Sequence, residues 1–444
     1  MIRVWRSTLA LATAGAIGAL VTVGQRPSTS PKTLSRSAEQ EPTADPTQAG
    51  SRTEVPEASP AIQASRRLSM PALFLPTARP PISPSATPWP TPLVEQLTEG
   101  VTTVAAAGDF VYLAGGVQLV VVDAQDPGRP KPRGSVRWTW PDSVVAWHAE
   151  VSGNIVYVMG SDRMIGEKST GDGTYLVTVD VTSPDKPRWL GTLAIHEMSF
   201  SMAVADGWIY VAGFERYAIS EPADAGLVVV DARRPEAMVR HGFVPVAMVP
   251  LAVRLQGTRG VVAGVTEVYD HGPLTSALDL ADRSQPRVGP PVPMELDQRP
   301  WYMAMRGGSA LVTGGRLKAA AVEIGSPSLL ASSTTASLLA DYCTIGGLAA
   351  SEGAYFVRTR QCHQDRVLAF DGAIETSDTR GIPAQFPILG SIPTESDEPW
   401  LTTTMATVPG RLYLIGCDAW GKVSTLTIMD ISRPEAMRVI GRLD

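Results

Sequence analysis

Cysteine, histidine and charged side chains are all scarce in this chain. It has 3 cysteines and 5 histidines in 444 residues, and 18% of its residues are charged. Three cysteines are too few for a disulfide scaffold. The formal net charge of −6 argues against a nucleic-acid partner, because such a protein needs a basic surface to neutralise phosphates.

Short catalytic and metal-binding motifs are also missing. The sequence has no HExxH or HxxxH spacing, no glycine-rich phosphate loop and no GxSxG elbow. We therefore predict no cofactor and no metal site, although ligands contributed by separate repeats would escape a motif search, which leaves calcium or zinc open. Hydrophobic residues make up 44% of the chain, and 40 glycines with 37 prolines indicate a globular protein that turns often.

The N-terminus has the composition of an export signal. Arg3 and Arg6 precede an uncharged, apolar stretch from Ser7 to Gly24. No clean A-x-A cleavage site follows it, and as a helix it would be about 27 Å long, just short of a bilayer core of about 30 Å. We expect residues 1–24 to be a signal peptide or an uncleaved membrane anchor. The protein would then be extracytoplasmic, either secreted or anchored to the outer side of the cytoplasmic membrane, with membrane contact only through this segment.

Residues 25–92 form a second compositional block. Stretches such as RPSTSPKTLSRS and RPPISPSATPWPTP are rich in Pro, Ser and Thr and poor in large apolar residues. Such a segment cannot bury enough surface to offset the entropy of ordering it. We expect a disordered linker, with one apolar island at Leu68–Leu75 (LSMPALFL).

From residue 101 onward one unit of four short strands, called a to d, recurs seven times. Each copy begins with a hairpin whose turn contains a glycine. These glycines lie 45 to 57 residues apart, at Gly108, Gly153, Gly207, Gly257, Gly308, Gly353 and Gly410. Strand c then ends on an acidic residue, at Asp123, Asp180, Asp231, Asp279, Glu323, Asp371 and Asp430. The pentapeptide RPEAM occurs at 234–238 and again at 433–437, as expected from internal duplication.

Four strands per unit at this period indicate a β-propeller rather than a helical solenoid. We predict an all-β fold with seven blades of four antiparallel strands over residues 93–444. The first strand would be inner and the last outer, so strand exchange at ring closure is not visible in the sequence.

The strand-c motif resembles the LVIVD-repeat family of bacterial β-propellers. It reads LVVVD to Asp123, LVTVD to Asp180, LVVVD to Asp231 and LTIMD to Asp430. The resemblance covers about residues 101–444, and it is weaker in copies 4 to 6. It implies a propeller on an exported or cell-surface protein, and it brings no shared catalytic residues. We expect the repeated Asp to cap a turn by accepting backbone N–H groups, not to act as a ligand.

Function is expected where the copies differ. The b–c loops and the d–a connections emerge on one face of a propeller, and here they are long and irregular. Aromatic, His and acidic residues gather in them and just before the inner strands, and our candidate binding residues are Trp147, His148, His196, Glu197, Trp301, Tyr302, Asp341 and Trp400. These side chains either form a binding surface at the mouth of the central channel or plug that mouth.

The cysteines offer one candidate disulfide. Cys343 and Cys362 lie at nearly equal distances from the predicted turn at Gly353, so they would face each other across a hairpin. Cys417 would then be free. The alternative pair is Cys362–Cys417, between neighbouring blades.

Three functions fit this architecture, because a propeller fold does not fix one. The first is a monomeric binding module that engages a protein, glycan or small ligand through its loop-rich face. The second is a hydrolase or lyase that uses a His and a carboxylate at the channel mouth, and the third is a structural spacer of the envelope. The few histidines and the missing motifs favour the binding module.

Overall fold

The computed structural model describes most of the chain from Val101 onward. The described ranges are 101–140, 144–162, 173–195, 198–214, 225–266, 272–296, 298–314, 318–326, 329–337, 344–360, 366–371, 388–394, 405–417 and 423–443. Residues 1–24, which we expect to be a signal peptide or anchor, residues 25–92, which we expect to be a linker, and the start of the predicted propeller at 93–100 lie outside these ranges. Within them, no helix has the length and apolar character needed to cross a membrane.

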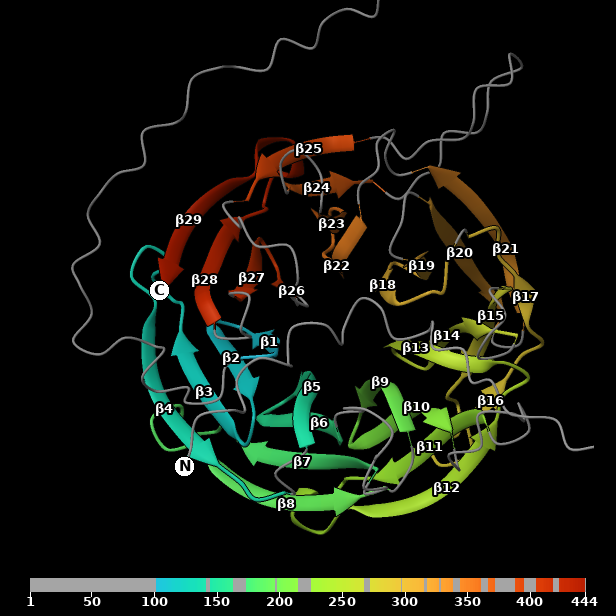
Figure 1. Ribbon diagram of the computed structural model, residues 1–444, viewed down its shortest axis with the longest axis horizontal. Coiled ribbons are helices and arrows are strands. Elements are labelled where there is room, and N and C mark those ends of the chain that lie inside the picture. The colour runs from blue at the N-terminus through green and yellow to red at the C-terminus, as the bar shows by residue number, and fades with distance from the viewer. Residues whose placement is uncertain are drawn as a thin grey trace, which may run out of the picture. The chain divides into compact units, whose positions relative to one another are not determined.

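The strands form seven separate sheets arranged around an axis (Figure 1). The first three sheets follow the chain four strands at a time: β1 (Thr103–Ala107), β2 (Phe110–Gly115), β3 (Gln118–Asp123) and β4 (Lys131–Arg137); β5 (Val144–Ser152), β6 (Ile155–Asp162), β7 (Thr174–Asp180) and β8 (Arg188–Ala194); β9 (Met198–Ala205), β10 (Trp208–Phe214), β11 (Ala225–Asp231) and β12 (Val239–Pro245), with a short 3-10 turn η2 (Pro235–Ala237) before β12.

The remaining sheets repeat this order to the end of the described chain: β13 (Val249–Gln256), β14 (Arg259–Val265), β15 (Pro273–Asp279), β16 (Arg287–Val288) and β17 (Val292–Pro293); β18 (Tyr302–Arg306), β19 (Ser309–Thr313), β20 (Lys318–Ser326) and β21 (Leu329–Ser337); β22 (Thr344–Ala350), β23 (Tyr355–Arg360), β24 (Arg366–Phe370) and β25 (Ile388–Pro393); β26 (Met405–Val408), β27 (Arg411–Cys417), β28 (Val423–Asp430), η3 (Pro434–Ala436) and β29 (Arg438–Leu443).

Every strand pairing in these sheets is antiparallel, as in the hairpin of β1 and β2, where Ala107 faces Phe110 across the turn. Gly108 in that turn has a φ of 55°, which is the conformation that favours glycine. The prediction of a seven-bladed propeller with four antiparallel strands per blade is confirmed. The first strand of each sheet lies nearest the axis and the last lies on the rim (Figure 1).

The hydrophobic core lies between the blades rather than in one central mass. Strands b and c carry unbroken apolar runs because both of their faces are covered, as in Leu119–Val122 of β3. Seven buried clusters each join residues of two neighbouring blades. One of them joins the last blade to the first, through residues such as Val104 and Tyr413. Each blade is therefore stabilised mainly by its neighbours.

A recurring glycine in strand d receives the c–d turn of the next blade. A Cβ at Gly191 of β8 would lie 2.9 Å from the carbonyl oxygen of Pro235 in η2. Thr178 of the same blade donates a 2.6 Å hydrogen bond to that oxygen. The equivalent glycines Gly134, Gly390 and Gly441 also lie against the next turn along the ring. The repeated RPEAM segments therefore join blades together.

The fourth, fifth and sixth blades, in which the sequence repeat is weak, each depart from the common pattern in one feature. In the fourth blade strand d is split into β16 and β17, because Pro290 and Pro291 between them have no N–H to donate. In the fifth blade β20 continues past Glu323, so this acidic residue lies within the strand. In the sixth blade Gly353 does not have a positive φ, unlike the other predicted turn glycines.

The repeated Asp caps its turn, as expected. Asp123 and Asp180 each accept a 2.9 Å hydrogen bond from the backbone N–H two residues later, and Asp231, Asp279 and Asp430 do the same at 3.0 to 3.1 Å. Hydrogen bonds from Thr182 and Arg188 lower the pKa of Asp180 to about 2. These carboxylates therefore serve to cap the turns.

Candidate functional site

Four of the inner strands carry a β-bulge near their N-terminal ends. The pairing of β5 with β6 skips Trp147, and the pairing of β9 with β10 skips Phe200. The corresponding shifts in β13 and β22 skip Leu251 and Gly346. A bulge re-aims the extra side chain out of the regular alternation of the strand. The same device thus places a different side chain at the same end of the second, third and fourth blades, and the glycine of the sixth blade adds none.

Two of these bulged residues meet a third aromatic from another blade. The indole Nε1 of Trp147 donates a 3.1 Å hydrogen bond to the carbonyl oxygen of Phe200. The ring of Phe200 lies edge-on to Trp301, with 6.3 Å between centroids, and edge-on to Phe214 at 6.0 Å. Trp147, Phe200 and Trp301 come from the second, third and fifth blades, and we call them the aromatic patch.

The aromatic patch is held in place but is not covered by the described residues. Trp147 is 51% exposed and Trp301 is 42% exposed. Phe200 beneath them packs against the buried cluster that includes Leu251 and Val265. Large rigid rings that remain exposed in this way offer contact area at little cost in side-chain entropy.

A charged group lies on the same inner strands, further along from the patch. His148 Nε2 lies 3.3 Å from Glu150 Oε1, and the guanidinium of Arg254 on β13 lies 3.9 Å from the same oxygen. The second oxygen, Oε2, accepts a 2.8 Å hydrogen bond from the backbone N–H of Val204 on β9. Glu150 therefore ties together the inner strands of the second, third and fourth blades.

The groups that surround His148 determine its protonation state. Burial, with 13% of its side chain exposed, lowers the pKa of His148, and the positive charge of Arg254 acts in the same direction. Glu150 opposes both effects and raises the pKa, but burial is the larger cause. The imidazole is therefore neutral at pH 7, and the pair is not a His–carboxylate ion pair.

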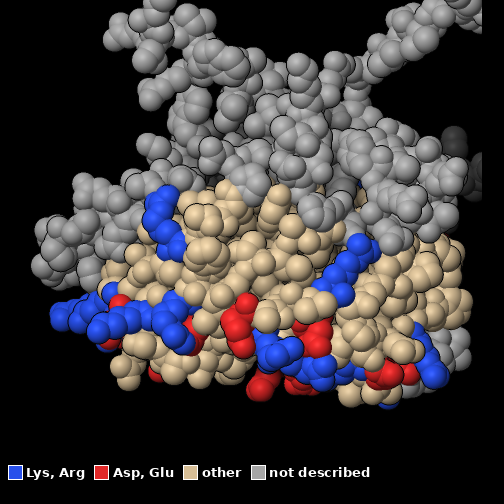
Figure 2. All heavy atoms as spheres, turned by 90° about the horizontal axis from the view of Figure 1, so that it is seen from below, with Lys and Arg blue, Asp and Glu red and all other residues tan. Residues whose placement is uncertain are grey.

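The face that carries the a–b and c–d turns has charged side chains in place of the exposed aromatic rings. Figure 2 shows Lys and Arg interleaved with Asp and Glu along one part of the described surface. These charges pair locally, as in Arg133 with Asp185 of the next blade at 2.7 Å and Arg188 with Asp180 at 2.7 Å. Such pairs support the turns, and in this part of the described surface charges of both signs alternate.

The predicted site residues are only partly brought together. Trp147 and Trp301 meet through Phe200, and His148 lies beside Glu150. Tyr302 instead packs against the buried cluster between the fifth and sixth blades. Four candidates lie outside the described residues: His196, Glu197, Asp341 and Trp400. So do Cys343 and Cys362 of the candidate disulfide, while Cys417 ends β27.

Sequence analysis missed Phe200, Glu150 and Arg254. No local pattern marks them, because each acts through contacts with residues about 50 to 100 positions away. The one available signal was their position in the repeat. Phe200 lies near the start of an inner strand, and Glu150 and Arg254 lie near the ends of theirs. In the described part of the chain, no three His, Cys, Asp or Glu side chains group closely enough to hold a metal ion.

Comparisons with known proteins found one matching family model and several similar solved structures. The model of the LVIVD repeat matches residues 100–137, which span the first blade. No curated protein matches the sequence. Among solved structures, Hsv2 of Kluyvelomyces marxianus is 9% identical with a TM-score of 0.49, covering 78% of this chain and 98% of its own. Sqt1 of Saccharomyces cerevisiae is 8% identical with a TM-score of 0.45, covering 78% and 86%. This chain is a seven-bladed β-propeller whose first blade matches the model of the LVIVD repeat.

Proposed function

We propose that the propeller is a binding module that engages a protein partner through the aromatic patch, outside the cytoplasm. One observation carries the proposal: two tryptophans from separate blades are fixed by a hydrogen bond and a ring contact, yet remain 51% and 42% exposed. Tryptophan is among the residues that contribute most to protein interfaces. Pre-organised rings lose little entropy when a partner covers them.

The two alternatives have less support. A hydrolase or lyase at this end needs a carboxylate that is free to take a proton, but both oxygens of Glu150 are engaged by inner-strand partners. A structural spacer that binds no ligand does not explain why two tryptophans remain exposed beside the packed ring of Phe200. The export-type N-terminal sequence supports the extracytoplasmic location.

The binding proposal is tested by photo-crosslinking in cells that produce the full chain. A photoreactive phenylalanine analogue replaces Trp147 or Trp301, and in control chains it replaces Val239 or Val439, which are exposed on the outer strands β12 and β29. We expect one discrete crosslinked protein from the two patch positions and not from the controls. In the chain that carries the probe at 147, Trp301→Ala should lower the yield at least about tenfold, since loss of such a ring costs about 2 kcal/mol or more.

Equal crosslinking at the outer strands, or a yield that ignores Trp301→Ala, would contradict the proposal. The location is tested separately with a C-terminal reporter enzyme that is active only after export. Deletion of residues 1–24 should abolish the reporter activity without lowering the amount of folded protein. Absence of reporter activity in the full chain would contradict the extracytoplasmic location, and activity that persists after the deletion would show that residues 1–24 are not the export signal.

A further inference from the structure

Three side chains on the inner strands β5 and β13 form what we call the charged triad: His148, Glu150 and Arg254. His148 directly follows Trp147, the residue of the aromatic patch on β5. Arg254 bonds to Ser201, which directly follows Phe200, the patch residue on β9. The strands β5, β9 and β13 lie side by side around the axis (Figure 1). A movement within the triad therefore reaches the patch over a single residue.

Arg254 of β13 holds the segment of β9 that carries Phe200. Its Nη1 donates a 3.2 Å hydrogen bond to Ser201 Oγ and a 3.4 Å hydrogen bond to the carbonyl oxygen of Met202. The backbone N–H of Val253 donates to the same Ser201 Oγ at 3.3 Å. Ser201 is the first residue after the bulge of β9, and it is buried. The fourth blade therefore fixes the bulge that presents Phe200.

Glu150 of the second blade holds the same segment from the other side. Its Oε2 accepts a 2.8 Å hydrogen bond from the backbone N–H of Val204 on β9. Its Oε1 lies 3.3 Å from His148 Nε2 and 3.9 Å from Arg254 Nη1. Glu150 thus anchors β9 and at the same time balances the charge of Arg254.

The charges of the triad balance only while His148 is neutral. In the described part of the chain, its ion-pair contacts comprise one carboxylate, Glu150, and one guanidinium, Arg254. The strands β1 and β9, which flank β5 around the axis, carry no titratable side chain. Tyr112 of β2 and Tyr157 of β6 stay neutral, because burial raises the pKa of both. A proton on His148 would therefore put two positive charges beside one negative charge.

The surroundings of the triad oppose a second positive charge. The side chains of His148 and Arg254 are 13% and 31% exposed, so water screens their charges only in part. Burial and the charge of Arg254 both lower the pKa of His148. Once the imidazole is protonated, we expect one of the two cations to leave the triad. If His148 leaves, it pulls on Trp147, and if Arg254 leaves, it releases Ser201. Either movement removes a support of the aromatic patch.

We propose that the charged triad is a pH-sensitive device, which holds the aromatic patch in its binding arrangement at neutral pH and releases it in acid. The inference rests on the proposed function of the patch, but the release takes place in the free protein and can be measured without a partner. The device acts below about pH 6.5, where an imidazole of ordinary or lowered pKa gains its proton. A partner bound through the patch would be held at neutral pH and lost in acidic surroundings.

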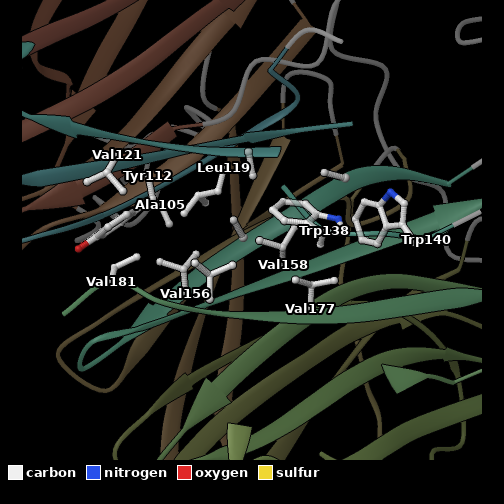
Figure 3. Packing of buried hydrophobic residues seen from close by; sticks show 14 of the residues in the cluster. Ala105, Tyr112, Leu119, Val121, Trp138, Trp140, Val156, Val158, Val177 and Val181 are labelled. Carbon is white, nitrogen blue, oxygen red and sulfur yellow. The ribbon is translucent and has the colours of Figure 1, made fainter. Parts of the chain in front are cut away.

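The first measurement is a pH titration of the free full chain by nuclear magnetic resonance. It follows the ring protons of His148 and the indole proton of Trp147 from about pH 7.5 to about pH 4.5. Because that indole donates to the carbonyl oxygen of Phe200, its signal should move with the midpoint of the His148 titration. Its protection against solvent exchange, relative to free tryptophan at each pH, should fall at least about tenfold, the change that one hydrogen bond supports. The buried indoles of Trp138 and Trp140, which lie edge-on in the core between the first and second blades (Figure 3), should keep their signals.

Two variants show whether His148 is the sensor. His148→Gln can still donate to Glu150 but gains no proton in this range, so the Trp147 signal should stay constant down to about pH 4.5. Glu150→Gln removes the negative charge that raises the pKa of His148, so both transitions should shift together to lower pH. The Trp138 and Trp140 signals report whether each variant is folded. A Trp147 signal that stays constant through the His148 titration of the unaltered chain, or that still moves in His148→Gln, would overturn the proposal.

The second measurement connects the release of the patch to binding. Photo-crosslinking from position 301 is carried out on cells held at about pH 7.5 and at the acidic end of the His148 titration. The yield should fall at least about tenfold in acid, and it should stay high in a chain that also carries His148→Gln. An unchanged yield, while the Trp147 signal moves, would overturn the proposal, because release of the patch would not control binding. If position 301 captures no protein at either pH, the proposed function fails, and the titration of the free chain alone decides whether the triad releases the patch.

Discussion

Gly441 in the last strand of the propeller lies directly against the carbonyl oxygen of Pro127 in the first blade, so that a Cβ at 441 would overlap that oxygen. This is the contact that Gly191 makes with Pro235 between the second and third blades. Arg411 adds a 2.8 Å hydrogen bond to the carbonyl oxygen of Ala124 across the same joint. The ring therefore closes by a contact that also joins three other pairs of blades, and in the described residues each sheet is built from strands consecutive in the chain.

The first prediction concerns this joint. Gly441→Ala should lower the free energy of unfolding by about 1–3 kcal/mol, because the added methyl group separates strand β29 from the Pro127 turn. Urea denaturation of the full chain measures the change. Gly242→Ala is the matched control, since Gly242 occupies the equivalent position in the third blade but a Cβ there would meet nothing within 4 Å. Equal effects of the two substitutions would show that the contact at 441 does not hold the ring closed.

The second prediction concerns the turn carboxylates. The pKa of Asp180 is about 2 in the folded protein, below the value of about 3.9 expected in the unfolded chain. A lowered pKa stabilises the fold above pH 4, and this contribution is lost as the pH falls through 2. Asp180→Asn should therefore cost about 1 kcal/mol at pH 7, and the difference from the unaltered chain should shrink between pH 4 and pH 2.

Glu236→Gln, at an exposed carboxylate of η2 in the next blade, serves as the control for Asp180→Asn. It should leave the stability at pH 7 unchanged within about 0.5 kcal/mol. A constant cost of Asp180→Asn from pH 7 to pH 2 would show that the carboxylate charge plays no part in the turn.

The third prediction concerns His148. Because burial lowers its pKa in the folded state, the unfolded chain binds more protons below about pH 6.5, and stability should fall as the pH drops through that value. His148→Gln should remove this part of the pH dependence. Glu150→Gln should lower the pKa of His148 further, because Glu150 now raises it. Titration of the imidazole protons by nuclear magnetic resonance measures both; a rise in the pKa after Glu150→Gln would contradict the assigned contact.

The fourth prediction concerns the packing of Trp140. Gly160→Ala should force the indole away from β6 and destabilise the fold by about 1–3 kcal/mol. The near-ultraviolet circular dichroism of the buried Trp138–Trp140 pair should change with it. Gly242→Ala again provides a control at a strand glycine with open space. A variant with unchanged stability and unchanged near-ultraviolet signal would mean that Trp140 does not rest on Gly160.

Local patterns predicted the parts of this fold that depend on local chemistry. The hairpin at Gly108 follows from the need for a positive φ, and the end of strand c at Asp123 follows from a carboxylate that caps its own turn. The duplicated RPEAM segments also indicated a repeat. What those segments contact was not predictable, because Pro235 meets Gly191 only when two blades are packed side by side.

The candidate site was harder to predict from local sequence patterns than the fold. The sequence predicted Trp147 and Trp301 just before inner strands; the structure has Trp301 directly before β18 but Trp147 as the fourth residue of β5. The sequence did not supply Phe200, because a one-residue bulge cannot be told from regular alternation in a single sequence. Tyr302, adjacent to Trp301, was grouped with it although successive residues of a strand point to opposite faces.

The way the ring closes also bears on where the chain could begin. The joint between the last and first blades uses the same glycine-and-turn contact as the joints after the first, second and sixth blades, so it is not a special seam. A circularly permuted gene that links Leu443 to Val101 and opens the chain between two other blades would keep every blade whole. The position of the termini would then be set by where the linker must attach and not by what the fold requires.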